Sequence, residues 1–121
     1  MDRLRASVQP YAWGDPKFIA DLQGRTPSGQ PEAELWMGAH PKAPSRLADT
    51  DQPLDDAIAT DPGILLGTSI AEHYGRLPYL AKVLAAAQPL SIQSHPSLPQ
   101  ARAGYAREND AGVALDAADR T

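Results

Sequence analysis

Short runs in which hydrophobic and polar residues alternate recur along this chain. Such alternation is typical of strands with one buried and one exposed face. It predicts strands at 4–8, 33–39, 79–84 and 90–95, with a briefer pairing segment at 45–47. Twelve prolines are spread between these runs rather than repeated, which suits many short elements joined by fixed turns.

Other segments have the spacing of amphipathic helices. They are 17–22, 51–60 and about 98–108, the last preceded by Ser97, a good N-cap residue. The apolar segment 64–67 is predicted to be a short buried stretch, because it follows a break at a proline and a glycine.

The predicted strands outnumber the helices in the segments able to form a core. No regular strand–helix–strand alternation is visible, so the predicted fold class is β-rich α+β. The segment 110–121 has only Val113 and Leu115 as large apolar residues, and we expect a loop or loose C-terminal end there.

The composition excludes several function classes. The chain has 121 residues, enough for one domain with a core, and no cysteine, so disulfides and thiolate metal sites are excluded. Fifteen acidic against eleven basic residues give a net charge of −4 without a basic patch, which argues against nucleic acid as a partner. No apolar stretch is long enough to span a bilayer, so we expect a soluble cytoplasmic protein without a membrane partner.

The segment 90–95 carries the most suggestive chemistry. In a strand, Ser91, Gln93 and His95 would point to one face, opposite Leu90 and Ile92. An imidazole suits Zn²⁺ and an amide oxygen is a less usual ligand, so Gln93 and His95 could share one ion. A catalytic zinc normally needs three protein ligands. From these residues alone, a pair lining a water-facing strand is the favoured alternative.

Four further side chains are candidates for a polar pocket. Lys82 interrupts an apolar strand and either reaches out to water or holds an anion, in which case Ser91 could join it around a phosphate. Glu34 is either a pocket acid or part of a water-facing strand surface. Trp13 lies beside a turn and either stacks on a sugar ring or fills the core.

Four sequence blocks resemble one known family when taken together. They read YAWG at 11–14, AELWMGAHP at 33–41, LPYLAKVL at 77–84 and LSIQSHP at 90–96. Their order and spacing resemble those of the type I mannose-6-phosphate isomerases, also called phosphomannose isomerases. The resemblance extends over nearly the whole chain, and four ordered blocks are far more specific than any one of them.

The resemblance implies an incomplete portion of a cupin-type (jelly-roll) β-barrel with a helical insertion. It also implies a zinc-dependent isomerase that interconverts mannose 6-phosphate and fructose 6-phosphate and so serves the supply of mannose and GDP-mannose. The family's ligand block implies that Gln93 and His95 bind the one zinc ion. The residues that it implies for the sugar-phosphate pocket are Trp13, Glu34, Lys82 and Ser91.

The chain departs from the family pattern after the last block. Family members continue into a His-Lys-Pro-Glu block, whose glutamate is a zinc ligand, and later supply a second histidine and a pocket arginine; this sequence has none of them. We therefore expect 1–121 to be the N-terminal part of the catalytic domain and to be inactive alone. The catalytic base is not identified.

Two alternatives remain open at this point. The first is a non-catalytic cupin fragment that binds a sugar phosphate or a protein partner. The second is another metal-dependent cupin, such as an oxygenase or an epimerase; the absence of a second histidine close to His95 argues against it.

Overall fold

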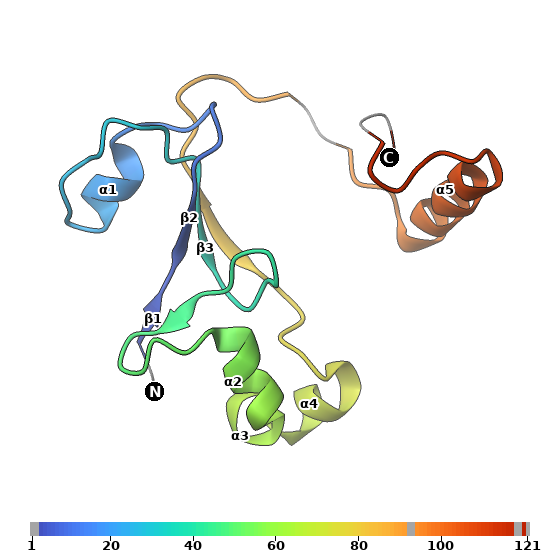
Figure 1. The fold of residues 1–121 in the computed structure, drawn as a ribbon, viewed down its shortest axis with the longest axis horizontal. Coiled ribbons are helices and arrows are strands. Elements are labelled where there is room, and N and C mark those ends of the chain that lie inside the picture. The colour runs from blue at the N-terminus through green and yellow to red at the C-terminus, as the bar shows by residue number, and fades with distance from the viewer. Residues whose placement is uncertain (1–2, 92–93, 118–119, 121) are drawn as a thin grey trace. The chain divides into compact units, whose positions relative to one another are not determined.

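The computed structural model describes residues 3–91, 94–117 and 120. The chain divides into two compact units, 1–90 and 91–121, which are treated separately below. Figure 1 shows the helices and strands of both.

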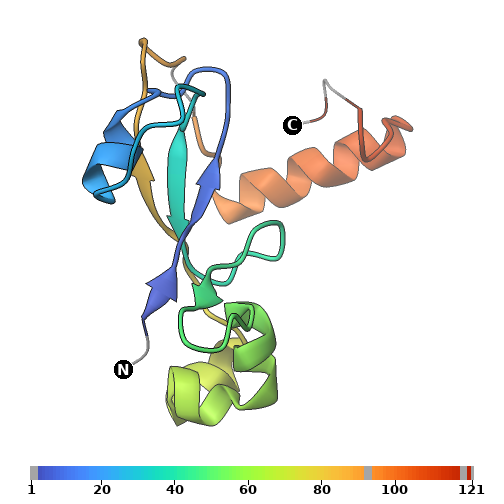
Figure 2. The same ribbon diagram turned by 60° about the vertical axis from the view of Figure 1, so that its left-hand side comes forward.

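Two small antiparallel sheets form the centre of the first unit. The larger has the strand order β2–β3–β5, and the smaller pairs β1 with β4. Figures 1 and 2 show β2, β3 and β5 side by side. The strands are β1 (Leu4–Arg5), β2 (Ser7–Gln9), β3 (Glu34–Met37), β4 (Arg46–Leu47) and β5 (Ala81–Leu84). The strands predicted at 33–39 and 79–84 and the pairing segment at 45–47 are therefore confirmed within shorter bounds. The single strand predicted at 4–8 is instead two strands, β1 and β2, which belong to different sheets and end at Gln9.

The core lies on one face of the three-stranded sheet. Val8, Leu35 and Val83 are direct neighbours across β2, β3 and β5, so their side chains share this face. Ile19, which is fully buried, packs against them together with Ala85.

Ile19 comes from α1 (Phe18–Leu22), the short helix predicted at 17–22. Asp15 begins this helix by accepting hydrogen bonds from the main-chain N–H groups of Lys17 and Phe18, both at 2.8 Å. These two bonds, that of Phe18 first, lower the pKa of the Asp15 carboxyl below its ordinary value. These bonds hold the turn that leads into α1.

Three short helices are inserted between β4 and β5. They are α2 (Leu54–Thr60), α3 (Pro62–Leu66) and α4 (Thr68–Tyr74). Figure 1 shows them clustered beside the β1–β4 pair. The helix predicted at 51–60 is confirmed.

The buried stretch predicted at 64–67 is wrong, because Ile64 is 80% exposed. The chain forms α3 here instead: Asp61 accepts a hydrogen bond from the Ile64 N–H at 3.0 Å, and Pro62 suits the first helical position. A single short helix has no partner for all of its apolar side chains, and Ile64 lies on its uncovered side.

The second unit consists mainly of α5 (Leu98–Asp110), which confirms the helix predicted near 98–108. Ser97 precedes it and donates its N–H to the Gln100 side-chain oxygen at 2.9 Å, one half of a capping box. The described residues after Asp110 form turns. Among them, the Arg120 guanidinium lies 4.7 Å from the centre of the Tyr105 ring, and it donates to the Val113 carbonyl at 2.6 Å.

The strand predicted at 90–95 is wrong for the residues that the structure describes. Leu90, Ser91, Ser94 and His95 belong to no strand, while Ile92 and Gln93 lie outside the described residues. A strand is stable only when a neighbour satisfies its main-chain N–H and C=O groups. In the described part of the chain, no segment pairs with these four residues.

The predicted α+β class, with antiparallel sheets, is confirmed. The cupin-type barrel and the extent of the domain over 1–121 stay predictions. None of the described helices is long and apolar enough to cross a membrane.

Candidate functional site

The face of the three-stranded sheet opposite the core is mostly polar, although Leu84 also lies on it, directly beside Glu34. Alternation along β3 places Glu34 and Trp36 on this face, and the register places Lys82 of β5 directly beside Trp36. Ser7 and Gln9 of β2 lie beside Trp36 and Glu34 on the other side. Glu34 and Trp36 therefore lie on β3, the central strand, which has a neighbouring strand on each side.

Glu34, Trp36 and Lys82 contact one another and are named here the carboxylate–indole–ammonium cluster. The Trp36 indole N–H donates a hydrogen bond to the Glu34 carboxylate. The Lys82 ammonium lies 3.4 Å from the same carboxylate oxygen and 5.2 Å from the centre of the Trp36 ring. These distances fit an ion pair and a cation–π contact.

The two charged members differ in exposure, which bears on what the cluster can bind. The Glu34 side chain is 11% exposed, whereas that of Lys82 is 38% exposed. The lysine therefore neither reaches fully into water nor is sequestered. The Lys82 ammonium has three N–H donors, and the Glu34 carboxylate lies nearest to one of them. The other donors can therefore bind an incoming anion.

Ser45 holds the end of β3 in place. It is fully buried, and its hydroxyl donates to the Trp36 carbonyl at 3.2 Å while accepting the Gly38 N–H at 3.0 Å. The His40 ring packs edge-on against the Trp36 ring with 4.9 Å between centres. The sequence pattern alone did not indicate the roles of Trp36 and Ser45. The signal for Trp36 was its place two residues after Glu34, on the same strand face.

Trp13 lies in the loop between β2 and α1. Its ring is partly exposed, stacks on that of Tyr11 with 5.9 Å between centres, and is not part of the core cluster. The Trp13 carbonyl accepts the Ala87 N–H at 2.9 Å, which fixes the loop beyond the end of β5. A core-filling role is therefore wrong.

The remaining predicted site residues belong to the second unit or to undescribed positions. Ser91 and His95 are exposed and outside any helix or strand, and Gln93 lies outside the described residues. The structure thus brings Glu34 and Lys82 together in the first unit. Within 3–91, 94–117 and 120, no group of three or more His, Cys, Asp or Glu side chains could hold a metal ion.

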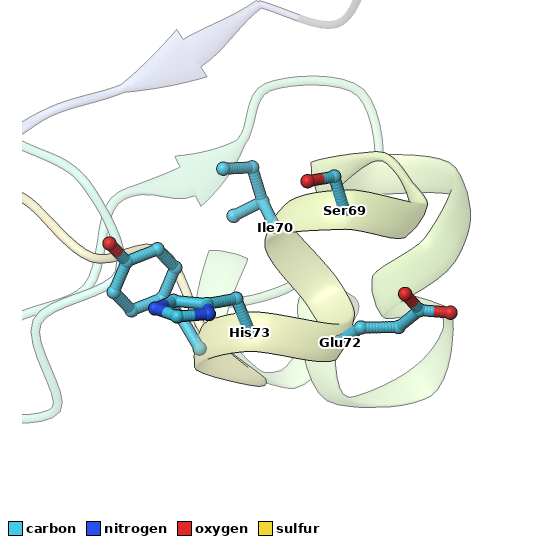
Figure 3. A pocket seen from close by; sticks show the side chains of 5 residues that line it. Ser69, Ile70, Glu72 and His73 are labelled. Atoms are coloured by element: carbon cyan, nitrogen blue, oxygen red, sulfur yellow. The ribbon is translucent and has the colours of Figure 1, made fainter.

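A surface hollow on α4 carries polar groups but no convergent arrangement. It is lined by Ser69, Ile70, Glu72, His73 and Tyr74. Figure 3 shows the Glu72 and His73 side chains pointing in opposite directions along the helix. The His73 ring packs edge-on against Tyr74, with 4.4 Å between centres. We assign no binding site here.

Comparison with known proteins decides the family. The family described as "Phosphomannose isomerase type I, catalytic domain" matches residues 1–115. The chain belongs to this family. The phosphomannose isomerase family is thus the one that the four sequence blocks indicated.

Several relatives of this chain are named mannose-6-phosphate isomerase. Mannose-6-phosphate isomerase of Escherichia coli (strain K12) is 51% identical over 99% of the chain, and that of Aspergillus fumigatus is 37% identical over 88%. The chain spans 32% of the length of the E. coli relative and 25% of the A. fumigatus one.

Solved structures of the family match the fold as well. Mannose 6-phosphate isomerase from Salmonella typhimurium, bound to its substrate f6p and to zinc, has a TM-score of 0.86 at 48% identity. A structure of mannose 6-phosphate isomerase bound with zinc and yttrium has a TM-score of 0.87 at 49% identity. Both matches cover 99% of this chain and 31% of the other.

Proposed function

We propose that this chain contributes part of the sugar-phosphate pocket of a zinc-dependent isomerase that interconverts mannose 6-phosphate and fructose 6-phosphate. The observation that carries the proposal is the carboxylate–indole–ammonium cluster on the polar sheet face of a phosphomannose isomerase chain. The reaction would serve mannose and GDP-mannose supply, and we place it in the cytoplasm. Relatives that carry substrate and zinc support the proposal.

The proposed pocket residues have separate tasks. The Lys82 ammonium neutralises the phosphate, and this anchor positions the reacting carbons. The Glu34 carboxylate accepts a hydrogen bond from a sugar hydroxyl, and the partly exposed Trp13 ring stacks on the sugar. The phosphate contact that the family resemblance implies for Ser91 stays a prediction.

The isomerisation itself moves a proton between C1 and C2 of the sugar through an enediolate, and a base must carry that proton. We assign the base to none of the described residues. A zinc ion, when bound, supplies Lewis-acid stabilisation of the negative charge that develops on the carbonyl oxygen. The cluster on the sheet face holds the substrate while this proton moves.

We propose Gln93 and His95 as ligands of that zinc. His95 is exposed, and an imidazole and an amide oxygen suit the metal. Two ligands are fewer than the three that a catalytic zinc takes from protein, and the described residues offer no further cluster that would complete the set. The donors of this chain therefore fit only part of a zinc site, and we expect weak binding.

The proposal is tested by assaying the purified chain with mannose 6-phosphate and added zinc, and by calorimetry with the same sugar phosphate. We expect saturable binding without isomerisation. Turnover well above that of Gln93→Ala would contradict the expected inactivity. Absence of binding would contradict the proposed pocket.

A non-catalytic sugar-phosphate-binding role is the second candidate. It is favoured by one observation, that the paired charges proposed to hold the sugar phosphate, Glu34 and Lys82, both lie in the first unit of this chain. Binding that persists with no turnover, even when the remaining part of a relative is added as a separate polypeptide, would support this role over the first.

A further inference from the structure

Trp36 lies between the two charged residues of the proposed pocket and touches both. We propose that it is a positioning residue for sugar-phosphate binding: its indole N–H fixes the Glu34 carboxylate, and its ring face holds the Lys82 ammonium. This inference rests on the proposed function and deepens it. It assigns separate tasks to the edge and the face of a single side chain.

The hydrogen bond to Glu34 leaves half of the carboxylate for a ligand. Among the described residues, the bonds from Trp36 and Lys82 both go to Oε2 of Glu34. Each carboxylate oxygen accepts two hydrogen bonds, so these two bonds fill Oε2 and leave Oε1 as the acceptor for a sugar hydroxyl. Because the indole is rigid, its N–H also fixes the rotation of the carboxylate.

The ring face does a different task for Lys82. A lysine ammonium sits on a flexible stem with four carbons and loses much conformational freedom when it binds an anion. The Trp36 ring, 5.2 Å from the ammonium, attracts it and restricts the conformations of the Lys82 side chain before a ligand binds. Part of the entropy cost of binding a phosphate is thereby met in the free protein.

Trp36 is itself held firmly, as a positioning residue must be. It is 6% exposed and lies on the central strand, with Ser7 and Lys82 as its direct neighbours in the sheet. Its carbonyl accepts the Ser45 hydroxyl and its ring contacts His40. The indole therefore cannot leave without breaking contacts on several sides.

Two substitutions separate the tasks. Trp36→Phe keeps an aromatic face for Lys82 and removes the N–H donor, whereas Trp36→Leu removes both. Calorimetry with mannose 6-phosphate and with inorganic phosphate distinguishes the loss of the N–H donor from the loss of the aromatic face. Phe18→Leu, at an exposed aromatic residue on α1, is the matched control, and we expect it to bind both ligands like the wild type.

We expect Trp36→Phe to weaken mannose 6-phosphate about ten-fold, the scale of one charge-assisted hydrogen bond, and inorganic phosphate less than about two-fold. We expect Trp36→Leu to weaken both ligands. Equal affinity of wild type and Trp36→Phe for mannose 6-phosphate would overturn the inference alone. If the wild-type chain binds neither ligand, the proposed function fails and the inference falls with it.

A spectroscopic measurement does not depend on whether the Trp36 variants fold. The chain has two tryptophans, so Trp13→Phe leaves a single indole N–H resonance, that of Trp36. In this background, Glu34→Gln and Lys82→Met should each shift the resonance, as should saturating mannose 6-phosphate. A resonance that none of the three changes moves would overturn the inference.

Discussion

The hydroxyl of Ser45 donates a hydrogen bond to the main-chain carbonyl of Trp36, 3.2 Å away, from a fully buried position. The same oxygen accepts the N–H of Gly38, and the Gly38 carbonyl in turn accepts the N–H of Ser45 at 2.8 Å. One small polar residue thus closes the loop that follows β3. The geometry of the cluster on the sheet face depends on this closure.

Ser45→Ala should lower the free energy of unfolding by about 1–3 kcal/mol, because a buried carbonyl and a buried N–H lose their partner. Urea unfolding followed by tryptophan fluorescence measures this. Ser69→Ala, at an exposed position in α4, is the matched control and should change stability by less than about 0.5 kcal/mol. A Ser45→Ala variant as stable as the control would show that water replaces the hydroxyl.

Gly14 should tolerate no side chain. A Cβ atom there would lie 2.4 Å from the main-chain nitrogen of Ala33, closer than any real contact, and backbone cannot move aside as a flexible side chain can. We expect Gly14→Ala to destabilise the protein by roughly 2 kcal/mol or more in thermal or urea unfolding, because it forces the Trp13 loop away from the sheet.

Gly63→Ala provides the control for this substitution. Gly63 lies in α3, where the added Cβ would meet only an ordinary contact at 3.7 Å, and alanine favours the helix over glycine. The Gly63→Ala variant should be as stable as the wild type or slightly more stable. Equal effects of the two substitutions would contradict the close approach of Gly14.

The Arg25–Glu32 pair should make stability depend on pH. Arg25 donates hydrogen bonds to both carboxylate oxygens of Glu32, one at 2.9 Å, and these bonds lower the pKa of the Glu32 carboxyl from its ordinary value of 4.5. The stabilisation that the Arg25–Glu32 pair contributes is fully present above pH 4.5. It is lost as the pH falls through the lower folded-state pKa, because the unfolded chain takes up the proton first.

Glu32→Gln should therefore be less stable than the wild type at pH 7, and the difference should shrink as the pH drops below 4.5. Urea midpoints across a pH series measure it, and Arg25→Met should show the same trend. A difference that stays constant down to acid pH would mean that the charge on Glu32 adds nothing.

Local sequence patterns predicted β3 and β5 well because both strands have close neighbours in this chain. Their alternation also placed Glu34 and Lys82 as candidates for a polar pocket. Trp36 was missed, because its role depends on the register that sets it beside Lys82, a residue distant in the sequence. Register is a property of the pairing and is not encoded in either strand alone.

The segment 90–95 shows the opposite case. Its alternation is regular, yet its described residues form no strand, since pairing requires a partner that the described part of the chain does not provide. Likewise, Ile64 is apolar but exposed, because hydrophobicity predicts burial only where a second element covers the residue.

The most direct test of the central claim, that the polar sheet face binds a sugar phosphate, is a calorimetric titration of the wild type, Lys82→Arg and Lys82→Met with mannose 6-phosphate. We predict that Lys82→Met weakens binding about ten-fold or more, that Lys82→Arg retains most of it, and that unphosphorylated mannose binds weakly to all three. Equal affinity of Lys82→Met and the wild type for mannose 6-phosphate would contradict the account.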